Sequence, residues 1–301
     1  MSLLVVGSVG YDDVETPFDK IEKALGGSAT YISLAASYFS APINMVGVVG
    51  EDFKDTDIKM LEAHNINLDG LEIVKGGKTF RYGCKYQYDL NVRDTLFTHL
   101  NVFENFDPVI PDKWKNNSFL LLGNILPSLQ LKVIEQMKGL RLMVCDTMNL
   151  WINTMLDDLL VVLSKVDMLI INDSEARLLA NEPNLIKAAK IIREFGPKYL
   201  IIKKGEHGAL LFGEDSIFSA PAYPLESIFD PTGAGDAFAG GFAGYLHKTQ
   251  DLSFDNIKKA VIYGSAMASF SVGKFSTKGL ENLSNLEIHD RYIEFRELSS
   301  F

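Results

Sequence analysis

Short runs of consecutive apolar residues recur along the chain, and a small or polar residue closes each of them. Continuous apolarity, as opposed to alternation, is typical of β-strands that are buried on both faces. The runs are Leu3–Val6, Ile43–Val49, Phe119–Leu122, Leu142–Cys145, Met168–Ile171 and Tyr199–Ile202. Because residues with helical spacing separate most of these runs, the pattern predicts an α/β fold with a mostly parallel sheet covered on both faces.

The predicted helices follow from apolar residues that share one helical face. They are a helix capped by Ser28, the stretches 54–64, 128–137, 184–195 and 255–270, and a last helix that carries Ile288, Tyr292 and Phe295. The runs Ala209–Phe212 and Ser216–Ser219 predict an antiparallel edge of the sheet. Ligands gather at the carboxyl ends of parallel strands, which is where Asp146, Asn172 and Lys203 are expected.

Two stretches, about 11–25 and 78–100, interrupt the alternation of strands and helices. In the second, Phe80–Tyr88 alternates large with small or polar side chains, as a half-exposed strand does. Both stretches follow strands of the main sheet, so we expect a small β lid over the strand ends; a surface hairpin without a ligand role is the alternative. Since no linker divides the chain, residues 1–301 are expected to form one domain with a discontinuous lid.

Composition narrows the classes of partner and compartment. Hydrophobic residues make up 47% of the chain and charged residues 23%, as in ordinary globular proteins. The net charge of −10 argues against a nucleic-acid partner, because a polyanion requires a basic face. Cys84 and Cys145 are too few for a disulfide framework and are expected to be buried free thiols. No signal peptide or membrane-spanning run is evident, so we expect a cytoplasmic protein.

The stretch Asp230-Pro231-Thr232-Gly233-Ala234-Gly235-Asp236 carries the strongest chemical signal. It follows the apolar run Ser227–Phe229 and precedes a helical pattern that extends to Leu246, which predicts a strand end, a glycine turn and a helix N-terminus. The N–H groups of such a turn, together with the helix dipole, suit an anion such as phosphate. A carboxylate in the first helical turn would repel that anion unless it served as a base. Asp236 therefore indicates phosphoryl transfer to a hydroxyl group.

Three other stretches can contribute to a phosphate site. Gly26-Gly27 precedes the first helix, where glycines permit a ligand to approach the backbone. Asn172 and Glu175 begin a helix, and their oxygens suit Mg²⁺ and its waters, although compensation of the helix dipole is the alternative. Residues 203–208 form another glycine-bearing turn, for which an ordinary β-turn with solvated lysines is the alternative.

Other reaction classes lack their signatures. Gly76-Gly77-Lys78-Thr79 is similar to the end of a P-loop, but Glu72 occupies the position of a required glycine. Gly7-Ser8-Val9-Gly10 lacks the third glycine and the helix of a dinucleotide-binding fingerprint. The five histidines show no metal-ligand spacing, and no nucleophile–histidine pair stands out.

Taken together, these residues resemble the ribokinase-like (PfkB) carbohydrate kinase family over essentially the whole chain. Residues 230–236 are close to the family signature Asp-Thr-x-Gly-Ala-Gly-Asp, and Gly26-Gly27, Asn172 with Glu175, and the turn 204–208 precede it in the family's order. The resemblance implies a three-layer α/β/α ribokinase-like fold with a β lid. It also implies ATP and Mg²⁺ as cofactors, with K⁺ as a candidate further cation.

The resemblance assigns roles by position. It makes Asp236 the catalytic base and the amides of Gly233, Ala234 and Gly235 the anion hole. It places Asn172, Glu175, Lys203, Gly205, Gly208 and Thr232 at the nucleotide, with Glu175 at Mg²⁺ through water and Asp230 with Thr232 at a monovalent cation. It places Asp12, Gly26 and Gly27 at the acceptor, and the loop Phe270–Ser276 at the adenine. Tyr31 and Arg81 are further candidates for the acceptor side because of their own chemistry.

Two departures from the family pattern fall on the acceptor side. Tyr31 occupies a position where family members often carry Asn, and Asp146-Thr147-Met148-Asn149-Leu150-Trp151 replaces the family's Asp-Pro-Asn-x-Arg. They leave the kinase chemistry intact and put ribose or fructose in question as the acceptor. Tyr31 could stack on a sugar or nucleobase ring, and Arg81 and Arg93 in the lid could recognise an anionic sugar.

The sequence therefore predicts an ATP-dependent phosphotransferase that acts on a hydroxyl of a sugar or sugar-like small molecule. A nucleoside kinase on the same fold and a ligand-binding relative without catalysis are the alternatives. We expect the lid to close over the acceptor and exclude water, which competes as a nucleophile. By resemblance, the lid also offers a surface for a homodimer.

Overall fold

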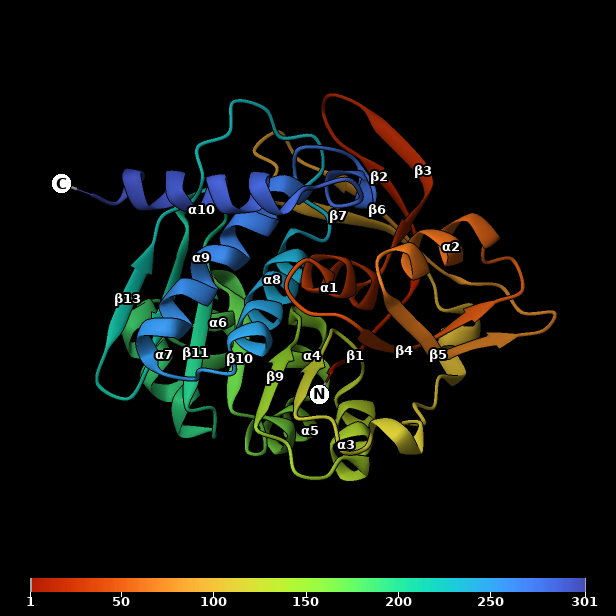
Figure 1. Cartoon of the computed structure of the whole chain (residues 1–301), viewed down its shortest axis with the longest axis horizontal. Helices are drawn as coiled ribbons and strands as arrows, with labels where there is room; N and C mark the ends of the chain where they lie inside the picture. Colours follow the sequence, from red (N-terminus) through yellow and green to blue (C-terminus); the bar gives the residue numbers. More distant parts are fainter. Residues whose placement is uncertain (1, 301) are drawn as a thin grey trace.

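A nine-stranded sheet forms the centre of the computed structural model, which describes residues 2–300 (Figure 1). Its strands lie in the order β13 (Ile217–Ala220), β12 (Ala209–Phe212), β11 (Tyr199–Lys203), β10 (Met168–Asn172), β9 (Leu142–Asp146), β8 (Phe119–Leu122), β1 (Leu3–Val6), β4 (Ile43–Gly50) and β5 (Ile66–Val74). All neighbouring pairs from β11 to β5 are parallel, whereas β12 and β13 pair antiparallel. The predicted antiparallel edge is confirmed.

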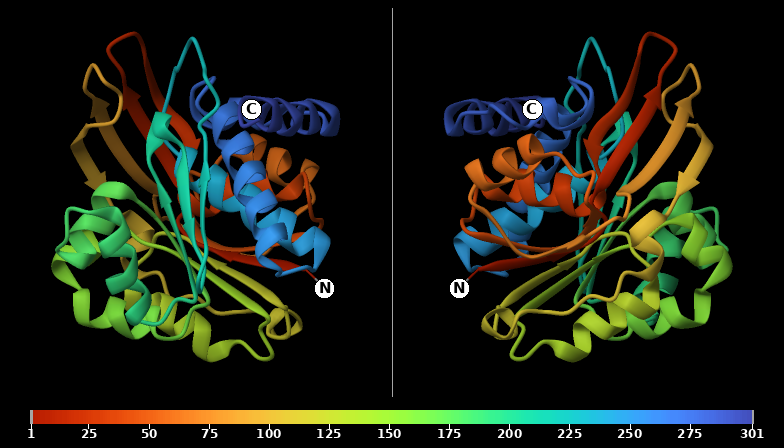
Figure 2. Two further views of the ribbon diagram at one scale, coloured as in Figure 1. Left: turned by 90° about the vertical axis from the view of Figure 1, so that its left-hand side faces the viewer. Right: turned by 90° about the vertical axis from the view of Figure 1, so that its right-hand side faces the viewer.

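Helices cover both faces of this sheet (Figure 2). One layer consists of α1 (Ser28–Ser37), α2 (Asp55–Ala63), α8 (Ala234–Thr249), α9 (Phe254–Ser271) and α10 (Asn285–Leu298). The other consists of α3 (Pro127–Gln136), α4 (Asn149–Thr154), α5 (Leu156–Leu163), α6 (Asp173–Ala180) and α7 (Leu185–Glu194). Short 3₁₀ helices occupy Asn101–Asn105, Asp112–Trp114, Gly205–His207 and Ser276–Gly279. The predicted three-layer α/β/α architecture is confirmed.

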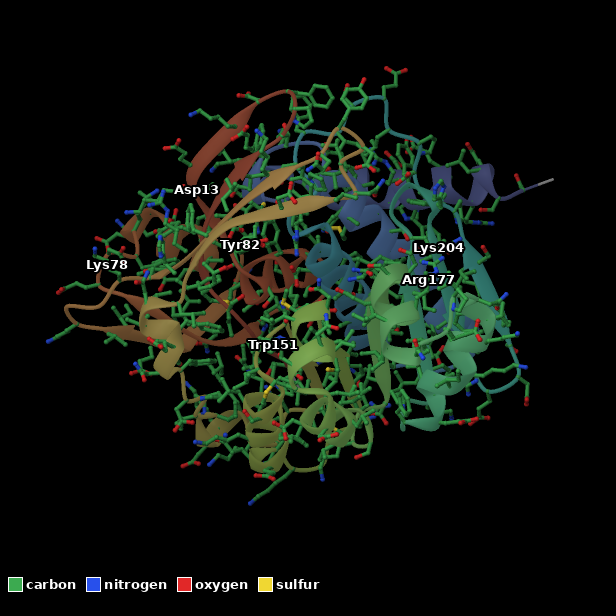
Figure 3. All side chains as sticks on the ribbon, turned by 180° about the vertical axis from the view of Figure 1, so that it is seen from behind. Asp13, Lys78, Tyr82, Trp151, Arg177 and Lys204 are labelled. Atoms are coloured by element: carbon green, nitrogen blue, oxygen red, sulfur yellow. The ribbon has the colours of Figure 1, made fainter. Side chains whose placement is uncertain are left out.

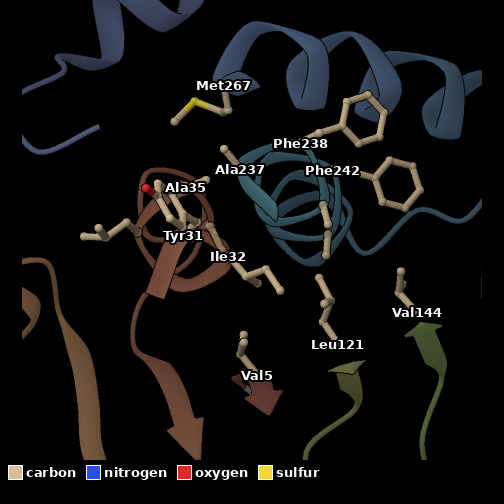
Figure 4. Close-up of a cluster of buried hydrophobic side chains, with 14 of the residues drawn as sticks. Val5, Tyr31, Ile32, Ala35, Leu121, Val144, Ala237, Phe238, Phe242 and Met267 are labelled. Carbon is tan, nitrogen blue, oxygen red and sulfur yellow. The ribbon is translucent and has the colours of Figure 1, made fainter. Parts of the chain in front are cut away.

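The core explains why the strands are apolar throughout. Successive side chains of a strand point to opposite faces, and both faces of this sheet are covered. Val5 therefore packs with α1 and α8 in one cluster, whereas Leu4 and Val6 pack in the cluster beneath the other helical layer. Figure 4 shows the first cluster, in which Val5 and Leu121 lie below Ile32 and Phe242.

A four-stranded lid projects from the end of the main sheet (Figures 1 and 2). Its strands lie in the order β3 (Lys20–Gly26), β2 (Gly10–Glu15), β6 (Phe80–Tyr86) and β7 (Arg93–His99). In Figure 3, Asp13 and Tyr82 mark the lid strands, while Trp151 belongs to α4 and Lys204 follows β11. The lid comes from the two stretches that lack helical periodicity, and it lies at the carboxyl ends of the parallel strands.

Two local expectations need correction. The run Ser227–Phe229 forms no strand; the segment is irregular, and its end is held by backbone hydrogen bonds from Phe229 and Asp230 to Val272. Ser28 does not cap α1, because its hydroxyl is engaged by Ser8 and Gly27 is the N-cap.

The edge strand β5 (Ile66–Val74) was not expected from the apolar runs. It lies at one end of the sheet and mixes Asn67, Asp69 and Glu72 with apolar residues, so it lacks the continuous apolarity of the central strands.

Candidate active site

The glycine turn at the start of α8 is shaped by a tyrosine beneath it. Gly233 is the N-cap residue and has a φ of 75°, a conformation that favours glycine. A Cβ at this position would lie 2.4 Å from the ring of Tyr31, which is fully buried. The turn and the ring therefore fit only because residue 233 has no side chain. The first N–H groups of α8 have no partners within the helix, although that of Ala234 donates to Pro231 O at 3.2 Å.

Asp236 lies in the first turn of α8 with one oxygen that nothing in the described chain satisfies. Its Oδ1 is buried and has no hydrogen-bond partner among residues 2–300. Burial, followed by the charge of Asp146, raises the pKa of Asp236 to about 7, while Lys203 and Arg93 act in the opposite direction. A carboxylate with a free oxygen and a pKa near neutrality is suited to accept a proton.

Lys203, the last residue of β11, points its ammonium group at this turn. A Cβ at Gly235 would lie 2.6 Å from Nζ of Lys203, so the ammonium occupies the space beside the first turn of α8. The positive end of the helix dipole lies there as well, and the two together attract an anion. The structure thus places Lys203, Gly233, Ala234, Gly235 and Asp236 around one position.

Asn172 and Glu175 are joined in a capping box at the start of α6. The Asn172 side chain accepts a hydrogen bond from Glu175 N at 2.8 Å, and Glu175 Oε2 accepts one from Asn172 N at 2.9 Å. This arrangement serves the helix, and it leaves Glu175 Oε1 for another partner. Burial, then the charge of Asp146, raises the pKa of Glu175 to about 7.

Asp146 joins these groups although no sequence motif assigns it a role. It ends β9, is buried, and accepts a hydrogen bond from Thr147 N at 2.9 Å. The charge of Asp146 raises the pKa values of both Glu175 and Asp236. Burial raises the pKa of Asp146 itself, and the charge of Lys203 acts in the opposite direction. Its predicted place at a strand end, beside Asn172 and Lys203, puts it where ligands gather without assigning it a role.

Asp12 and the paired glycines Gly26 and Gly27 form a second part of the site. Asp12, in β2, is buried against Gly26, where a Cβ would lie 2.0 Å from Oδ2. Burial, then the charge of Asp230, raises the pKa of Asp12 to about 7, and Asp236 adds to the shift. Gly27 has a φ of 94° and caps α1.

Tyr31 differs from the expectation that it could stack on a ligand ring. Its ring is enclosed in the core against Gly233, so no ligand can lie on its face. Figure 4 shows Tyr31 beside Ile32 and Ala35 in this core. Its hydroxyl is buried without a hydrogen-bond partner among the described residues. Burial and the charges of Asp12, Asp230 and Asp236 raise the pKa of Tyr31. The hydroxyl, and not the ring, is the part of Tyr31 that lies among the acidic groups.

Arg81 does not join the site. It forms a two-pronged ion pair with Asp13, with Nη2 2.6 Å from Oδ2 and Nε 3.1 Å from Oδ1. Asp12 and Tyr86 face the main domain, and side chains alternate along a strand, so Asp13 and Arg81 lie on the outer face of the lid. Arg93 pairs in register with Tyr86, and its charge lowers the pKa of Asp12 and of Asp236.

The lid contacts both the α8 motif and the β11–β12 turn. The hydroxyl groups of Tyr86 and Thr232 are 3.2 Å apart, which joins the inner face of the lid to the α8 motif. At the lid tip, Asn91 Nδ2 donates to Glu206 Oε1 at 3.3 Å, beside Gly205 in the β11–β12 turn. That turn ends at Gly208, whose φ of 80° and close contact with Ala220 require glycine.

Asp230 connects the motif to the chain that follows α9 through two hydrogen bonds. Its Oδ1 accepts a hydrogen bond from Thr232 N at 2.9 Å, and its Oδ2 accepts one from Ser276 N at 3.0 Å. Its expected contact with a monovalent cation, shared with Thr232, stays a prediction.

Within residues 2–300, no three acidic, histidine or cysteine side chains lie close enough to hold a metal together. No helix in that range is long and apolar enough to cross a membrane.

Comparison with known proteins agrees with the fold. The model of the pfkB family of carbohydrate kinases matches residues 3–282. A cytidine kinase of Thermococcus kodakarensis is 30% identical over 251 residues, which cover 81% of this chain and 88% of the relative.

Solved structures agree over nearly the whole length. The nucleoside kinase of Methanocaldococcus jannaschii superposes with a TM-score of 0.78 at 19% identity, covering 97% of this chain and 98% of the other. Arabidopsis thaliana ribokinase, solved with ribose and ATP, gives a TM-score of 0.74 at 20% identity, covering 97% of this chain and 98% of the other. At these identities the structural likeness shows the fold.

Proposed function

This chain belongs to the pfkB family of carbohydrate kinases, and on that premise we propose that it transfers a phosphoryl group from ATP to a hydroxyl of an uncharged nucleoside. The observation that carries the proposal is the free, buried Oδ1 of Asp236 beside the glycine turn and Lys203. A base and an anion site within one helical turn are what transfer of a phosphoryl group to an alcohol requires.

Each group near the turn has one task in this reaction. Asp236 accepts the proton of the acceptor hydroxyl as its oxygen attacks the phosphorus and the bond to the leaving diphosphate breaks. The N–H groups of Gly233, Ala234 and Gly235 stabilise the charge on the transferred group, and Lys203 adds a positive charge at the same place. The lid, which contacts the motif through Tyr86 and Thr232, excludes water that would otherwise compete with the acceptor.

The acidic residues at the strand ends fit a magnesium ion held largely through water and phosphate. Mg²⁺ keeps several waters and takes one or two carboxylates along with substrate phosphates, which agrees with the absence of a direct three-residue metal cluster in residues 2–300. Glu175, with Oε1 outside the capping box, and Asp146 are the carboxylates that would orient it. When bound, Mg²⁺ would neutralise phosphate charge.

The charge of the acceptor side favours an uncharged acceptor. The charges of Asp12, Asp230 and Asp236 all act on the Tyr31 hydroxyl, and they would repel a phosphorylated or carboxylated substrate. Hydroxyl-rich molecules suit these acceptors of hydrogen bonds. The 30%-identical relative is a cytidine kinase, which supports a nucleoside. A free pentose is the second candidate, supported by the ribokinase that binds ribose and ATP on this fold.

A panel of nucleosides and free pentoses, scored by release of ADP, tests this function. We expect turnover with at least one nucleoside and none with sugar phosphates, because the acidic acceptor side repels them. Asp236→Asn serves as the blank for the chemical step. Turnover of pentoses without nucleosides would favour the second candidate, and absence of turnover across the panel would contradict both.

A further inference from the structure

An arginine outside the site lies between two aromatic rings in a clamp formed by Tyr223, Arg291 and Phe270. The guanidinium carbon of Arg291, in α10, is 3.8 Å from the centre of the Tyr223 ring and 4.3 Å from that of the Phe270 ring. Nη1 donates to Ser269 Oγ at 2.6 Å, and Nε donates to Glu294 Oε2 at 3.1 Å. Stacking on both faces and hydrogen bonds at the edges fix the orientation of the guanidinium plane.

One ring of the clamp anchors an irregular segment. Tyr223 belongs to residues 221–229, which contain no helix or strand and connect β13 to Asp230. The start of this segment packs against Gly208, and its end is held by the hydrogen bond from Phe229 N to Val272 O at 2.9 Å. Between these points, the Tyr223 side chain docks on the helices, where the centre of its ring lies 5.7 Å from that of Phe295.

The other ring anchors the end of α9 and the stretch after it, to which the irregular segment 221–229 is hydrogen-bonded. Phe270 lies near the end of α9, and the chain that follows supplies Val272 O to Phe229 and Ser276 N to Asp230. Both anchored segments therefore meet at Asp230, the residue that opens the glycine turn. Asp230 in turn accepts the hydrogen bond from Thr232 N that begins the turn.

We propose that Arg291 is a positioning residue for phosphoryl transfer, acting by holding these two segments in register so that the turn 232–235 keeps its geometry. Donors of an anion site must be placed before the charge develops, and a displacement of about 1 Å is enough to reduce turnover strongly. The inference rests on the proposed function for its kinetic consequence. The contact itself lies outside the acceptor and phosphate positions, and its Phe270 begins the loop that the family resemblance places at the adenine.

The test compares Arg291→Met with Arg296→Met, which removes an exposed arginine from the same helix. We expect Arg291→Met to lower kcat by about 10- to 100-fold with the acceptor KM within about twofold, because the turn and not the acceptor side is displaced. Arg296→Met should leave both constants unchanged. A folded Arg291→Met protein with normal kcat, or an equal loss in Arg296→Met, would overturn the proposal.

A second readout does not depend on activity. Amide hydrogen exchange of residues 232–235 should become faster in Arg291→Met and stay unchanged in Arg296→Met. If wild-type protein turns over no acceptor, the proposed function fails, and exchange still decides whether the clamp holds the turn. If Arg291→Met does not fold, Tyr223→Leu removes one face of the clamp, and unchanged exchange and kcat in that variant would overturn the proposal.

Discussion

The acidic groups around the α8 turn divide into two regions that differ in how their oxygens are satisfied. Asp230 and Glu175 accept hydrogen bonds from backbone N–H groups, and they connect one segment of the chain to another. Asp236 keeps a buried oxygen without a partner in the described chain, and Asp12 is buried beside other carboxylates that raise its pKa. Folding explains the first region, whereas the second requires a partner that is not part of the chain.

The difference shows how structural and chemical carboxylates can be separated at one site. A buried polar atom without a partner costs about 1–3 kcal/mol, and a hydrogen bond or proton from a bound molecule would recover this free energy. Tyr31 belongs with the second region, since its hydroxyl is also buried and unpartnered in the described chain. The predictions below follow from this division.

The largest expected effect comes from exchanging one carboxylate of each region for its amide. Asp236→Asn should lower kcat by roughly 10²–10⁴, because the amide cannot accept the proton, while the folded state is retained. Asp230→Asn should instead lower the free energy of unfolding by about 1–3 kcal/mol, because one of its backbone N–H partners then faces an NH₂ group.

Acceptor-dependent ADP release and urea unfolding of both variants measure these effects. A kcat within tenfold of wild type in Asp236→Asn would remove the proposed base. Wild-type stability in Asp230→Asn would show that its two hydrogen bonds do not hold the motif together.

The next effect concerns pH. Asp236 must be ionised to act as a base, and burial raises its pKa to about 7, so kcat/KM should fall about tenfold for each pH unit below that value. A carboxyl group whose pKa is raised on folding favours the folded state as pH falls, so this loss of activity should occur without unfolding. A pH–rate profile alongside urea unfolding at pH 6 and 8 tests both statements. A flat profile between pH 5 and 8 contradicts the assignment of the base.

Asp12→Asn should have a smaller effect on activity than Asp236→Asn. Its effect on stability should be opposite in sign to that of Asp230→Asn. We expect the acceptor KM to rise about 10-fold or more with kcat less affected, because a charged hydrogen-bond acceptor is lost. The raised pKa of Asp12 means that its stabilising contribution is present below about pH 4 and is lost as the pH rises through about 7. The variant should therefore be more stable than wild type at pH 8, by about 1–3 kcal/mol, and nearly equal to it near pH 4. An equal change at both pH values would contradict this account of Asp12.

The sequence alone predicts the central strands well because burial on both faces leaves a simple pattern. Leu3–Val6, Phe119–Leu122 and Ala209–Phe212 have the predicted bounds. The edge strand β5 lacks that pattern, since polar residues are tolerated where one side of the strand has no neighbour. Ser227–Phe229 shows the converse, because a short apolar run next to a motif can form a backbone hydrogen bond with Val272 without entering the sheet.

At the site, the sequence indicates which residues matter more readily than which way they point. The motif predicts that Asp236 and the glycine turn lie together, because they are neighbours along the chain. The roles of Asp146 and Arg81 depend on contacts between distant strands, and a shift of one residue in a strand reverses the face that a side chain occupies. The partner of Arg81, Asp13, lies 68 residues away, and no local pattern indicates that pair.

The smallest effect distinguishes the two faces of the lid. Arg93 lies on the inner face, where its charge lowers the pKa values of Asp12 and Asp236, whereas Arg81 is neutralised by Asp13 on the outer face. Arg93→Met should therefore shift the acid limb of the kcat/KM profile to higher pH, by less than about one unit, because a charge near the lid surface is partly screened. Arg81→Met is the matched control and should leave the limb in place while costing at most about 1 kcal/mol of stability. If both variants shift the limb equally, the charge of the whole lid, and not its inner face, sets the pKa of the base.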